Sequence, residues 1–255
     1  MRVHASTAAL VQTAATAYWK TDFLGYFKAR GKLRGDPLFA EILARGLLAD
    51  ADRVLDLGCG QGLLAAWLEA ARRRYQENPQ LWPKEWPAPP HPVSYRGIEL
   101  RRRDVWRAQI ALRNRAEFEI GDIANADFRS VDAVVIMDVM HYLDYVSQER
   151  VLERTVTALE PGGMLLLRVS DAGAGIRFTF GKYIDCTVMM THYRRPPRVY
   201  CRSISEWQRL LTSVGFRSKT LPMSAGTPFA NHLLIAHPHN KARSSRNIMD
   251  SPITQ

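Results

Sequence analysis

Residues 54–62 read Val-Leu-Asp-Leu-Gly-Cys-Gly-Gln-Gly, and the fold prediction rests on these nine residues. A short apolar run leads into three alternate glycines, Gly58, Gly60 and Gly62, and apolar residues at helical spacing follow them. The pattern predicts a buried strand, a tight turn and a helix over residues 61–74. Glycine lets a ligand approach the main chain without meeting a Cβ, and the free N–H groups of the helix start would point into the turn.

The glycine spacing does not match two common nucleotide-binding loops. Dinucleotide and phosphate loops have longer gaps between glycines or end in Gly-Lys-Ser/Thr, and no lysine follows here. The nine residues instead resemble motif I of class I S-adenosylmethionine-dependent methyltransferases, which implies S-adenosylmethionine as the cofactor. In that family the acid, here Asp56, helps to orient the turn and the cofactor ammonium. The resemblance also places Gly58, Cys59, Gly60 and Gly62 against the methionine part of the cofactor.

Two further cofactor-binding segments follow in the family's order. A second strand ends at Glu99, and a carboxylate there can accept hydrogen bonds from both ribose hydroxyls. Leu100 follows it and is expected to contact the cofactor. A third strand runs into a loop in which Asp122 would accept a bond from the adenine amine and Ile123 would pack on the ring. These roles are implied by the resemblance.

The remaining strands complete the expected fold. Residues 132–138 are a nearly continuous apolar run, typical of a buried parallel strand. Residues 159–169 resemble the Pro-Gly-Gly turn and fifth strand of the family, and residues 216–221 and 231–237 are predicted as the last two strands. We therefore expect an α/β fold: a Rossmann-like, seven-stranded, mostly parallel sheet with helices on both faces and an antiparallel last strand.

The 255 residues are predicted to form one domain with added segments. We expect N-terminal helices over the site (1–50), a methyltransferase domain (51–237) that carries an insert (77–93) and a substrate lid (171–202), and a disordered basic tail (238–255). The second of two N-terminal helices is expected from residue 38 to about residue 48, after an Asp-Pro start. Ser203 and Glu206 have the spacing of a capping box.

The insert explains an unusual distance between two site residues. Glu99 lies 41 positions after Gly58, about twice the ~20 usual for a glycine loop and its ribose acid. The excess holds six prolines in the fifteen residues 78–92, which cannot form a helix interior or a central strand. We expect a peripheral loop that Trp82 and Trp86 anchor to the fold, with a partner-binding role as the alternative.

Aromatic residues recur at helical spacing near the N-terminus: Tyr18, Trp19, Phe23, Tyr26 and Phe27. Such a stripe favours packing into the core. In many enzymes of the resembled family the N-terminal helices close over cofactor and substrate, so a place for Tyr18, Trp19 or Tyr26 in the site is the alternative.

His141 is the best candidate for a catalytic base. It follows the fourth strand, where the resembled family lines its acceptor pocket, and histidine titrates near neutral pH. A backbone-bonded structural histidine is an equal alternative. Asp138 is a second catalytic candidate that would orient the cofactor or His141, and His192 is a weaker alternative base.

The acceptor side is expected to involve the loop after the fourth strand and the lid, through His141, Tyr142, Tyr183, His192 and Tyr193. A segment leaving the carboxyl end of a strand should overhang the site. The apolar residues of the lid and the arginines within 194–202 suit an aromatic or acyl acceptor that carries an acidic group, and a lid packed only on its own domain is an equal alternative. The chain has no Asn- or Asp-Pro-Pro-aromatic motif, which favours the small-molecule branches of the resembled superfamily.

Charge and cysteine content bear on partners and location. The formal net charge is +10, but the arginines are dispersed over what we interpret as solvated helix faces, which disfavours nucleic acid. Residues 29–37 are similar to methyltransferases of bacterial aryl polyene pathways, whose intermediates ride on acyl carrier proteins, and an acidic carrier would suit a basic surface. No membrane span or secretory signal is predicted. Three cysteines without paired spacing indicate no zinc site and fit a reducing cytoplasm.

The sequence thus predicts a cytoplasmic enzyme that moves a methyl group from S-adenosylmethionine to O or C of a small aromatic or acyl acceptor, free or carrier-bound. The alternatives are an RNA methyltransferase and a catalytically silent cofactor-binding partner protein.

Overall fold

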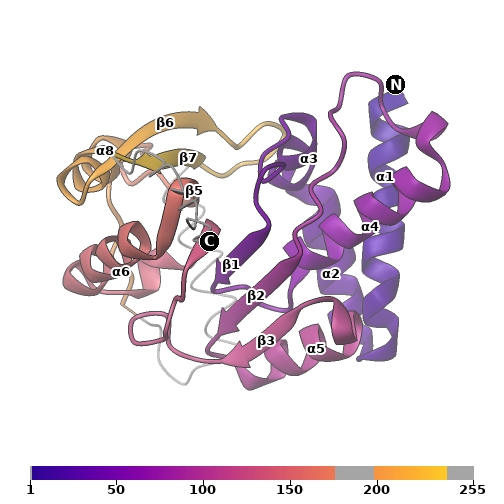
Figure 1. Cartoon of the computed structure of the whole chain (residues 1–255), viewed down its shortest axis with the longest axis horizontal. Coiled ribbons are helices and arrows are strands. Elements are labelled where there is room, and N and C mark those ends of the chain that lie inside the picture. The colour runs from indigo at the N-terminus through magenta and orange to yellow at the C-terminus, as the bar shows by residue number, and fades with distance from the viewer. Residues whose placement is uncertain (1, 176–197, 240–255) are drawn as a thin grey trace, which may run out of the picture.

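A seven-stranded sheet with the order β3-β2-β1-β4-β5-β7-β6 forms the centre of the protein (Figure 1). The computed structural model describes residues 2–175 and 198–239. The strands are β1 Arg53–Leu57, β2 Ser94–Glu99, β3 Glu117–Ile120, β4 Val131–Met137, β5 Leu159–Ser170, β6 Phe216–Pro222 and β7 Asn231–Pro238. Strands β1 to β5 pair in parallel, whereas β7 lies antiparallel between β5 and β6. The predicted fold class is confirmed.

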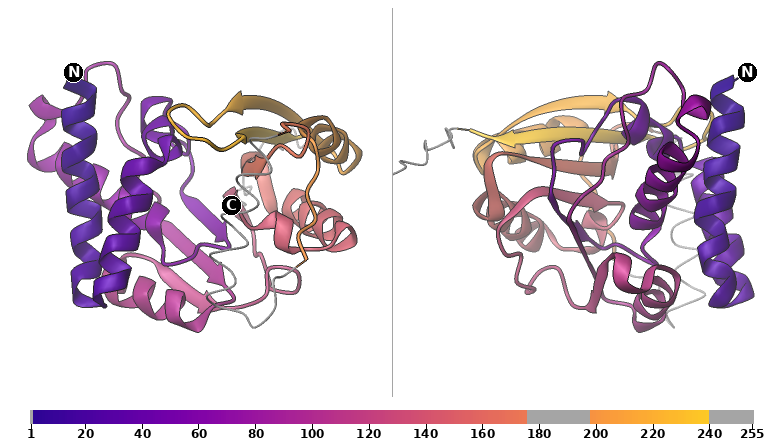
Figure 2. Two further views of the ribbon diagram at one scale, coloured as in Figure 1. Left: turned by 180° about the vertical axis from the view of Figure 1, so that it is seen from behind. Right: turned by 45° about the vertical axis from the view of Figure 1, so that its right-hand side comes forward.

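Helices cover both faces of this sheet. They are α1 Arg2–Thr16, α2 Phe23–Gly35, α3 Pro37–Ala44, α4 Leu63–Glu77, α5 Arg102–Leu112, α6 Tyr145–Ala158 and α8 Ile204–Ser213, with short 3₁₀ turns η1 Ala17–Lys20, η2 Pro79–Leu81, η3 Arg113–Arg115 and η4 Met140–Tyr142. Figure 2 shows α1 and α2 side by side on the flank that α4 and α5 also cover, with α6 and α8 on the other flank.

Alternation along the strands divides the apolar residues between two cores. Val54 joins a core with α1, α3, α4 and α5, and its neighbour Leu55 joins a second core with α6 and α8. Successive side chains of a strand point to opposite faces, so a parallel strand covered on both sides is apolar throughout. The two cores hold the carboxyl ends of β1, β2 and β4 in fixed positions along one edge.

The N-terminal helices begin where acidic side chains cap them. Asp22 accepts a hydrogen bond from the N–H of Gly25 (2.5 Å) and starts α2. Asp36 accepts one from the N–H of Leu38 (3.1 Å) and starts α3 with Pro37 as its first residue. The expected start of α3 is confirmed, but the helix ends at Ala44 rather than near residue 48. The chain turns there, with Gly46 and Leu48 at φ values of +62° and +69°.

The aromatic stripe near the N-terminus does not form a core as predicted. Tyr18 is fully buried, but Trp19, Phe23 and Phe27 are 65%, 70% and 46% exposed. These three side chains lie on the exposed side of η1 and α2, so helical spacing alone did not distinguish the inward face. Tyr26 packs partly on the core and makes an edge contact with Trp19.

Two further predictions about added segments are confirmed. Trp82 and Trp86 are both buried and contact each other edge to face at 5.6 Å, so they anchor the proline-rich insert to the fold. Ser203 and Glu206 form the capping box that starts α8. Within the described residues, no helix is long and apolar enough to cross a membrane.

Candidate functional site

The glycine turn after β1 is open to a ligand only at its centre. A Cβ on Gly58 would lie 2.8 Å from Val139, and one on Gly62 would lie 2.8 Å from Phe118, so neighbouring side chains fill both positions. Gly60 has a φ of +55°, and a Cβ there would meet nothing within 4 Å. The main chain at Gly60 is therefore the part of the turn that a bound molecule can approach.

Glu99 lies directly beside this opening. The side chain is 8% exposed, and its two oxygens accept hydrogen bonds from the N–H of Gly60 (3.0 Å) and of Arg101 (2.9 Å). A carboxylate has about four lone-pair positions, so acceptor capacity remains for two hydroxyl groups. The structure thus brings together the turn and the acid that the sequence paired across the long insert.

Asp56 is buried behind the turn and does not reach its opening. Its Oδ2 accepts a hydrogen bond from the hydroxyl of Tyr95 (2.6 Å), which joins β1 to β2. Burial raises the pKa of Asp56 to about 7, against a lowering by the Tyr95 hydrogen bond, and the charge of Glu99 raises it further. The geometry makes Asp56 a support of the β1–β2 pair; its contact with the cofactor ammonium remains a prediction.

The raised pKa of Asp56 predicts a pH-dependent stability. From about pH 4 to pH 7 the folded chain holds a proton at Asp56 that the unfolded chain has lost. The contribution of Asp56 to the free energy of unfolding is therefore largest below pH 4, and it declines as the pH rises to 7. Asp56→Asn keeps an acceptor for Tyr95 and does not ionise. We expect the Tm of Asp56→Asn to rise relative to that of the wild type between pH 4 and pH 7, as measured by thermal unfolding with circular dichroism. If the Tm values of the variant and the wild type changed by equal amounts with pH, Asp56 would have an ordinary pKa.

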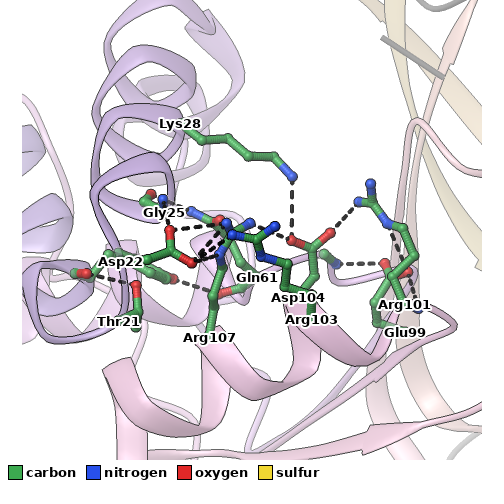
Figure 3. A network of polar contacts seen from close by, with 12 residues as sticks. Thr21, Asp22, Gly25, Lys28, Gln61, Glu99, Arg101, Arg103, Asp104 and Arg107 are labelled. Carbon is green, nitrogen blue, oxygen red and sulfur yellow. Dashed lines mark hydrogen bonds and ion pairs between the residues drawn. The ribbon is translucent and has the colours of Figure 1, made fainter. Parts of the chain in front are cut away.

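A buried polar network connects the N-terminal helices to Glu99 (Figure 3). Arg107 of α5 pairs with Asp22 at the start of α2 (3.0 Å) and with Asp104 (3.2 Å). Arg101 pairs with Asp104 (2.5 Å) and lies 3.5 Å from an oxygen of Glu99. The start of α2 is therefore tied to the ribose acid through alternating charges.

The glycine turn has its own links to the same helices. The side-chain amide of Gln61 donates to the carbonyl of Gly25 in α2 (3.0 Å), and the hydroxyl of Tyr18 donates to the carbonyl of Gln61 (2.7 Å). Of the aromatic residues considered for the site, Tyr18 thus supports the turn from within the core. The N-terminal segment fixes the turn as well as covering this flank of the fold.

The other predicted cofactor residues lie around this opening with different exposures. Ile123 is buried, whereas Leu100 is exposed. Asp122 is exposed and accepts bonds from the N–H of Ala124 and the amide of Asn125, both 3.0 Å. Burial raises the pKa of the Cys59 thiol well above its ordinary value, so Cys59 is a small neighbour of the turn rather than a nucleophile.

Four charged side chains form a cluster at the carboxyl ends of β4 and β5. Arg168 of β5 is 1% exposed and pairs with both Asp138, just after β4, and Asp36, at the start of α3 (2.5 Å). Lys32 of α2 lies 3.0 Å from Asp36 and 3.2 Å from Asp138. Burial alone would raise the pKa of both carboxyls, but Arg168 and Lys32 hold each below its usual range.

Three members of this cluster, Lys32, Asp36 and Asp138, line a cavity of about 240 Å³, and Arg168 pairs with two of them. The cavity is lined by residues of α2, the start of α3, the loop after β4, the end of β5 and the β6–β7 loop: Gly31, Lys32, Gly35, Asp36, Pro37, Asp138, His141, Ser170, Met223, Thr227, Phe229 and Asn231. Two predicted site residues, Asp138 and His141, therefore share one cavity. In open α/β sheets ligands bind at this carboxyl edge of the strands.

His141 lies in η4, and one nitrogen of its ring, Nε2, is buried without a hydrogen bond to the described residues. Burial lowers the pKa of His141, and Asp138 offsets only part of that effect, so the ring is neutral at pH 7. Gln148, itself fully buried, fixes the loop by donating to the carbonyls of Met140 (3.0 Å) and Leu143 (3.1 Å).

The structure describes residues 171–175 and 198–202 of the predicted lid segment. Tyr183, His192 and Tyr193 lie outside the described residues. Tyr142 packs its ring against His141, with centroids 4.0 Å apart. The N–H of Tyr200 donates to the carbonyl of His141 (2.8 Å), so the returning end of the lid segment holds the η4 loop.

Sequence reasoning missed much of the cavity wall. Arg168, which pairs with two of the lining carboxylates, is a charged residue within the apolar run 164–169, and this was a usable signal. Asp36 was expected only as a helix cap. Phe229 belongs to the connection before β7, which carried no recognisable motif, and Asn231 was expected only as the first residue of a strand.

The residues present fit the cofactor that the sequence predicted. The open main chain at Gly60 and the remaining acceptor capacity of Glu99 suit the methionine and ribose parts of S-adenosylmethionine. The contacts of Asp122 and Ile123 with the adenine remain a prediction. Among the described residues no group of three or more His, Cys, Asp and Glu could hold a metal ion.

Comparison with known proteins agrees with this arrangement. A curated relative, carboxy-S-adenosyl-L-methionine synthase of Chromohalobacter salexigens, is 30% identical over 145 residues, covering 52% of this chain and 48% of the relative. The chain thus matches about half the length of that relative.

Solved structures share the fold at low identity. An O-methyltransferase family protein from Burkholderia thailandensis has a TM-score of 0.59 at 19% identity, covering 85% of this chain and 59% of that one. Magnesium protoporphyrin IX methyltransferase from Synechocystis has a TM-score of 0.55 at 18% identity, covering 88% and 93%. A family model described as a methyltransferase domain matches residues 27–220. The chain therefore belongs to the methyltransferase domain family, whose cofactor is S-adenosylmethionine.

Proposed function

We propose that this methyltransferase transfers the methyl group of S-adenosylmethionine to an oxygen or carbon of a small aromatic or acyl acceptor that enters the cavity beside His141. The observation that carries the proposal is the neighbourhood of an unpartnered, buried His141 Nε2 and a cavity at the carboxyl edge of β4 and β5. The solved O-methyltransferase family protein with the same fold supports the choice of reaction.

The cofactor, when bound, supplies a methyl group on a positively charged sulfur that acts as the electrophile. The chain has two tasks on the acceptor side: it orients the acceptor and it takes up one proton. A neutral His141 can accept the proton of an acceptor hydroxyl, and its lowered pKa keeps it in the accepting form at pH 7. Holding the two reactants in line supplies much of the remaining acceleration.

We also propose that an acceptor carried by an acidic acyl carrier protein could be presented to this site. The formal net charge of +10 supports such a partner, because opposite charges steer association. The formal charge equally suits RNA, but no basic, aromatic strand face among the described strands supports that alternative.

The test is a product analysis with purified protein, S-adenosylmethionine and a library of phenols, enols and acyl thioesters. The proposal expects S-adenosylhomocysteine together with an acceptor 14 mass units heavier, as measured by liquid chromatography and mass spectrometry. Given the similarity to a carboxy-S-adenosyl-L-methionine synthase, the same run reveals any modified cofactor. A modified cofactor without a methylated acceptor would refute the proposal.

A further inference from the structure

Two glycines of α2 line the acceptor cavity without a local structural need. Gly31 and Gly35 both border the cavity, and a Cβ on either would meet nothing within 4 Å. Neither has a positive φ, so the backbone does not require glycine there. Glycine inside a helix is less favourable than alanine because it orders a more flexible chain. What the two positions provide is open space along the cavity wall.

The charges of the same cavity are fully paired. The cations Lys32 and Arg168 and the carboxylates Asp36 and Asp138 form one cluster whose formal charge is zero. Each cation contacts both carboxylates, so an acceptor carboxylate entering here would meet two like charges beside each cation. Burying an unpaired charge is costly.

The polar groups that remain are suited to a neutral partner. The hydroxyl of Ser170 donates to Oδ1 of Asn231 (2.7 Å), which leaves the amide nitrogen of Asn231 as a donor. His141 supplies an acceptor nitrogen, and Phe229, Met223 and Pro37 supply apolar surface. This set can bind a flat, uncharged molecule with one hydroxyl group.

Resting on the proposed function, we propose that Gly31 and Gly35 set the width of the acceptor pocket and that the paired cluster restricts it to acceptors uncharged at the bound end. The acceptor class is a planar phenol or enol lying along the glycine side of α2. The acidic group expected from the sequence depended on arginines within 194–202. The described cavity wall offers such a group no cation without a carboxylate partner.

The width is tested with Gly31→Ala and Gly31→Leu. Alanine favours the helix and meets no neighbour, so Gly31→Ala should raise the Tm while weakening acceptor binding, and Gly31→Leu should weaken binding at least tenfold. Arg34→Leu places the same side chain on α2 at an exposed residue that does not line the cavity, and it should leave acceptor affinity unchanged.

The predicted preference for uncharged acceptors is tested with two matched pairs of probes. The pairs are methyl 4-hydroxybenzoate against 4-hydroxybenzoate, and 2-naphthol against 6-hydroxy-2-naphthoate. We expect each neutral probe to bind at least tenfold more tightly in calorimetry with saturating S-adenosylhomocysteine. Asp36→Asn keeps a capping side chain but gives the cluster a charge of +1, so it should shift the preference toward the carboxylate probes.

The outcomes separate this inference from the proposed function. Absence of S-adenosylhomocysteine binding would refute the proposed function itself. If the protein binds the cofactor, any of three results would overturn the inference and leave the cofactor site intact. These are equal or better affinity for the carboxylate probes, no binding of the neutral probes, and unimpaired acceptor binding by Gly31→Leu.

Discussion

His141→Ala should lower turnover about 10²–10⁴-fold while leaving the affinity for S-adenosylmethionine within about twofold of the wild type. The reason is that His141 lines the proposed acceptor cavity with Asp138, whereas the predicted cofactor contacts are at Gly60 and Glu99. Steady-state kinetics on an acceptor found in the product screen, together with calorimetry for the cofactor, measures both quantities.

The pH profile gives a second readout of His141. Burial lowers its pKa from the ordinary value of 6.5, so the neutral form prevails at pH 7 and the rate should fall only at more acidic pH. Asp138, the charged group that acts on it, stays ionised across this range because Arg168 and Lys32 hold its pKa below the usual value despite its burial. The wild type should lose activity with one ionisation below 6.5 that His141→Gln lacks. An unchanged rate in His141→Ala would assign the residue a structural role.

Arg168→Met should destabilise the protein by about 3–5 kcal/mol, because it removes one member of a buried ion cluster and leaves two carboxylates without their main partner. Arg168 is 1% exposed and joins residues of β5, the loop after β4 and the start of α3. For a chain of this size the expected fall in Tm is roughly 10 °C. Thermal and urea unfolding provide the measurement.

Two further variants separate the charge effect from packing. Lys32→Met removes a cation that is 44% exposed and should cost no more than about 1 kcal/mol. Asp138→Asn in the Arg168→Met background removes one of the stranded carboxylates and should restore part of the loss. Because the folded pKa values of Asp36 and Asp138 are lowered, the contribution of the cluster should be present above pH 4 and vanish as the pH falls further. Equal Tm values for Arg168→Met and the wild type would contradict this account.

Local sequence determined what could be predicted about the fold. The strand alternation, the Asp-Pro helix start and the Ser203–Glu206 cap are short-range patterns, and each appears in the structure. The exposed side of α2 was not predictable from spacing, because a helical period shows that a face exists but not what it meets. The outcome for Trp19 and Phe23 illustrates this limit.

The candidate site also has a part that the sequence predicted and a part that it did not. The glycine turn and Glu99 lie on segments whose order along the chain resembles a known family, so the resemblance identified them. The Asp36–Asp138–Arg168 cluster joins residues up to 132 positions apart, and only the packing of α3 against the strand ends brings them together. The proposed acceptor cavity, built from helix, strand-end and loop residues far apart in the sequence, required the structure.

Calorimetric titration with S-adenosylmethionine tests whether the Gly60–Glu99 opening is the cofactor site. The account predicts one site per chain in the wild type and a loss of about 100-fold or more in affinity for Glu99→Ala, because two hydrogen bonds to a charged acceptor disappear. Wild-type protein that does not bind the cofactor, or Glu99→Ala that binds it undiminished while remaining folded, would contradict the account.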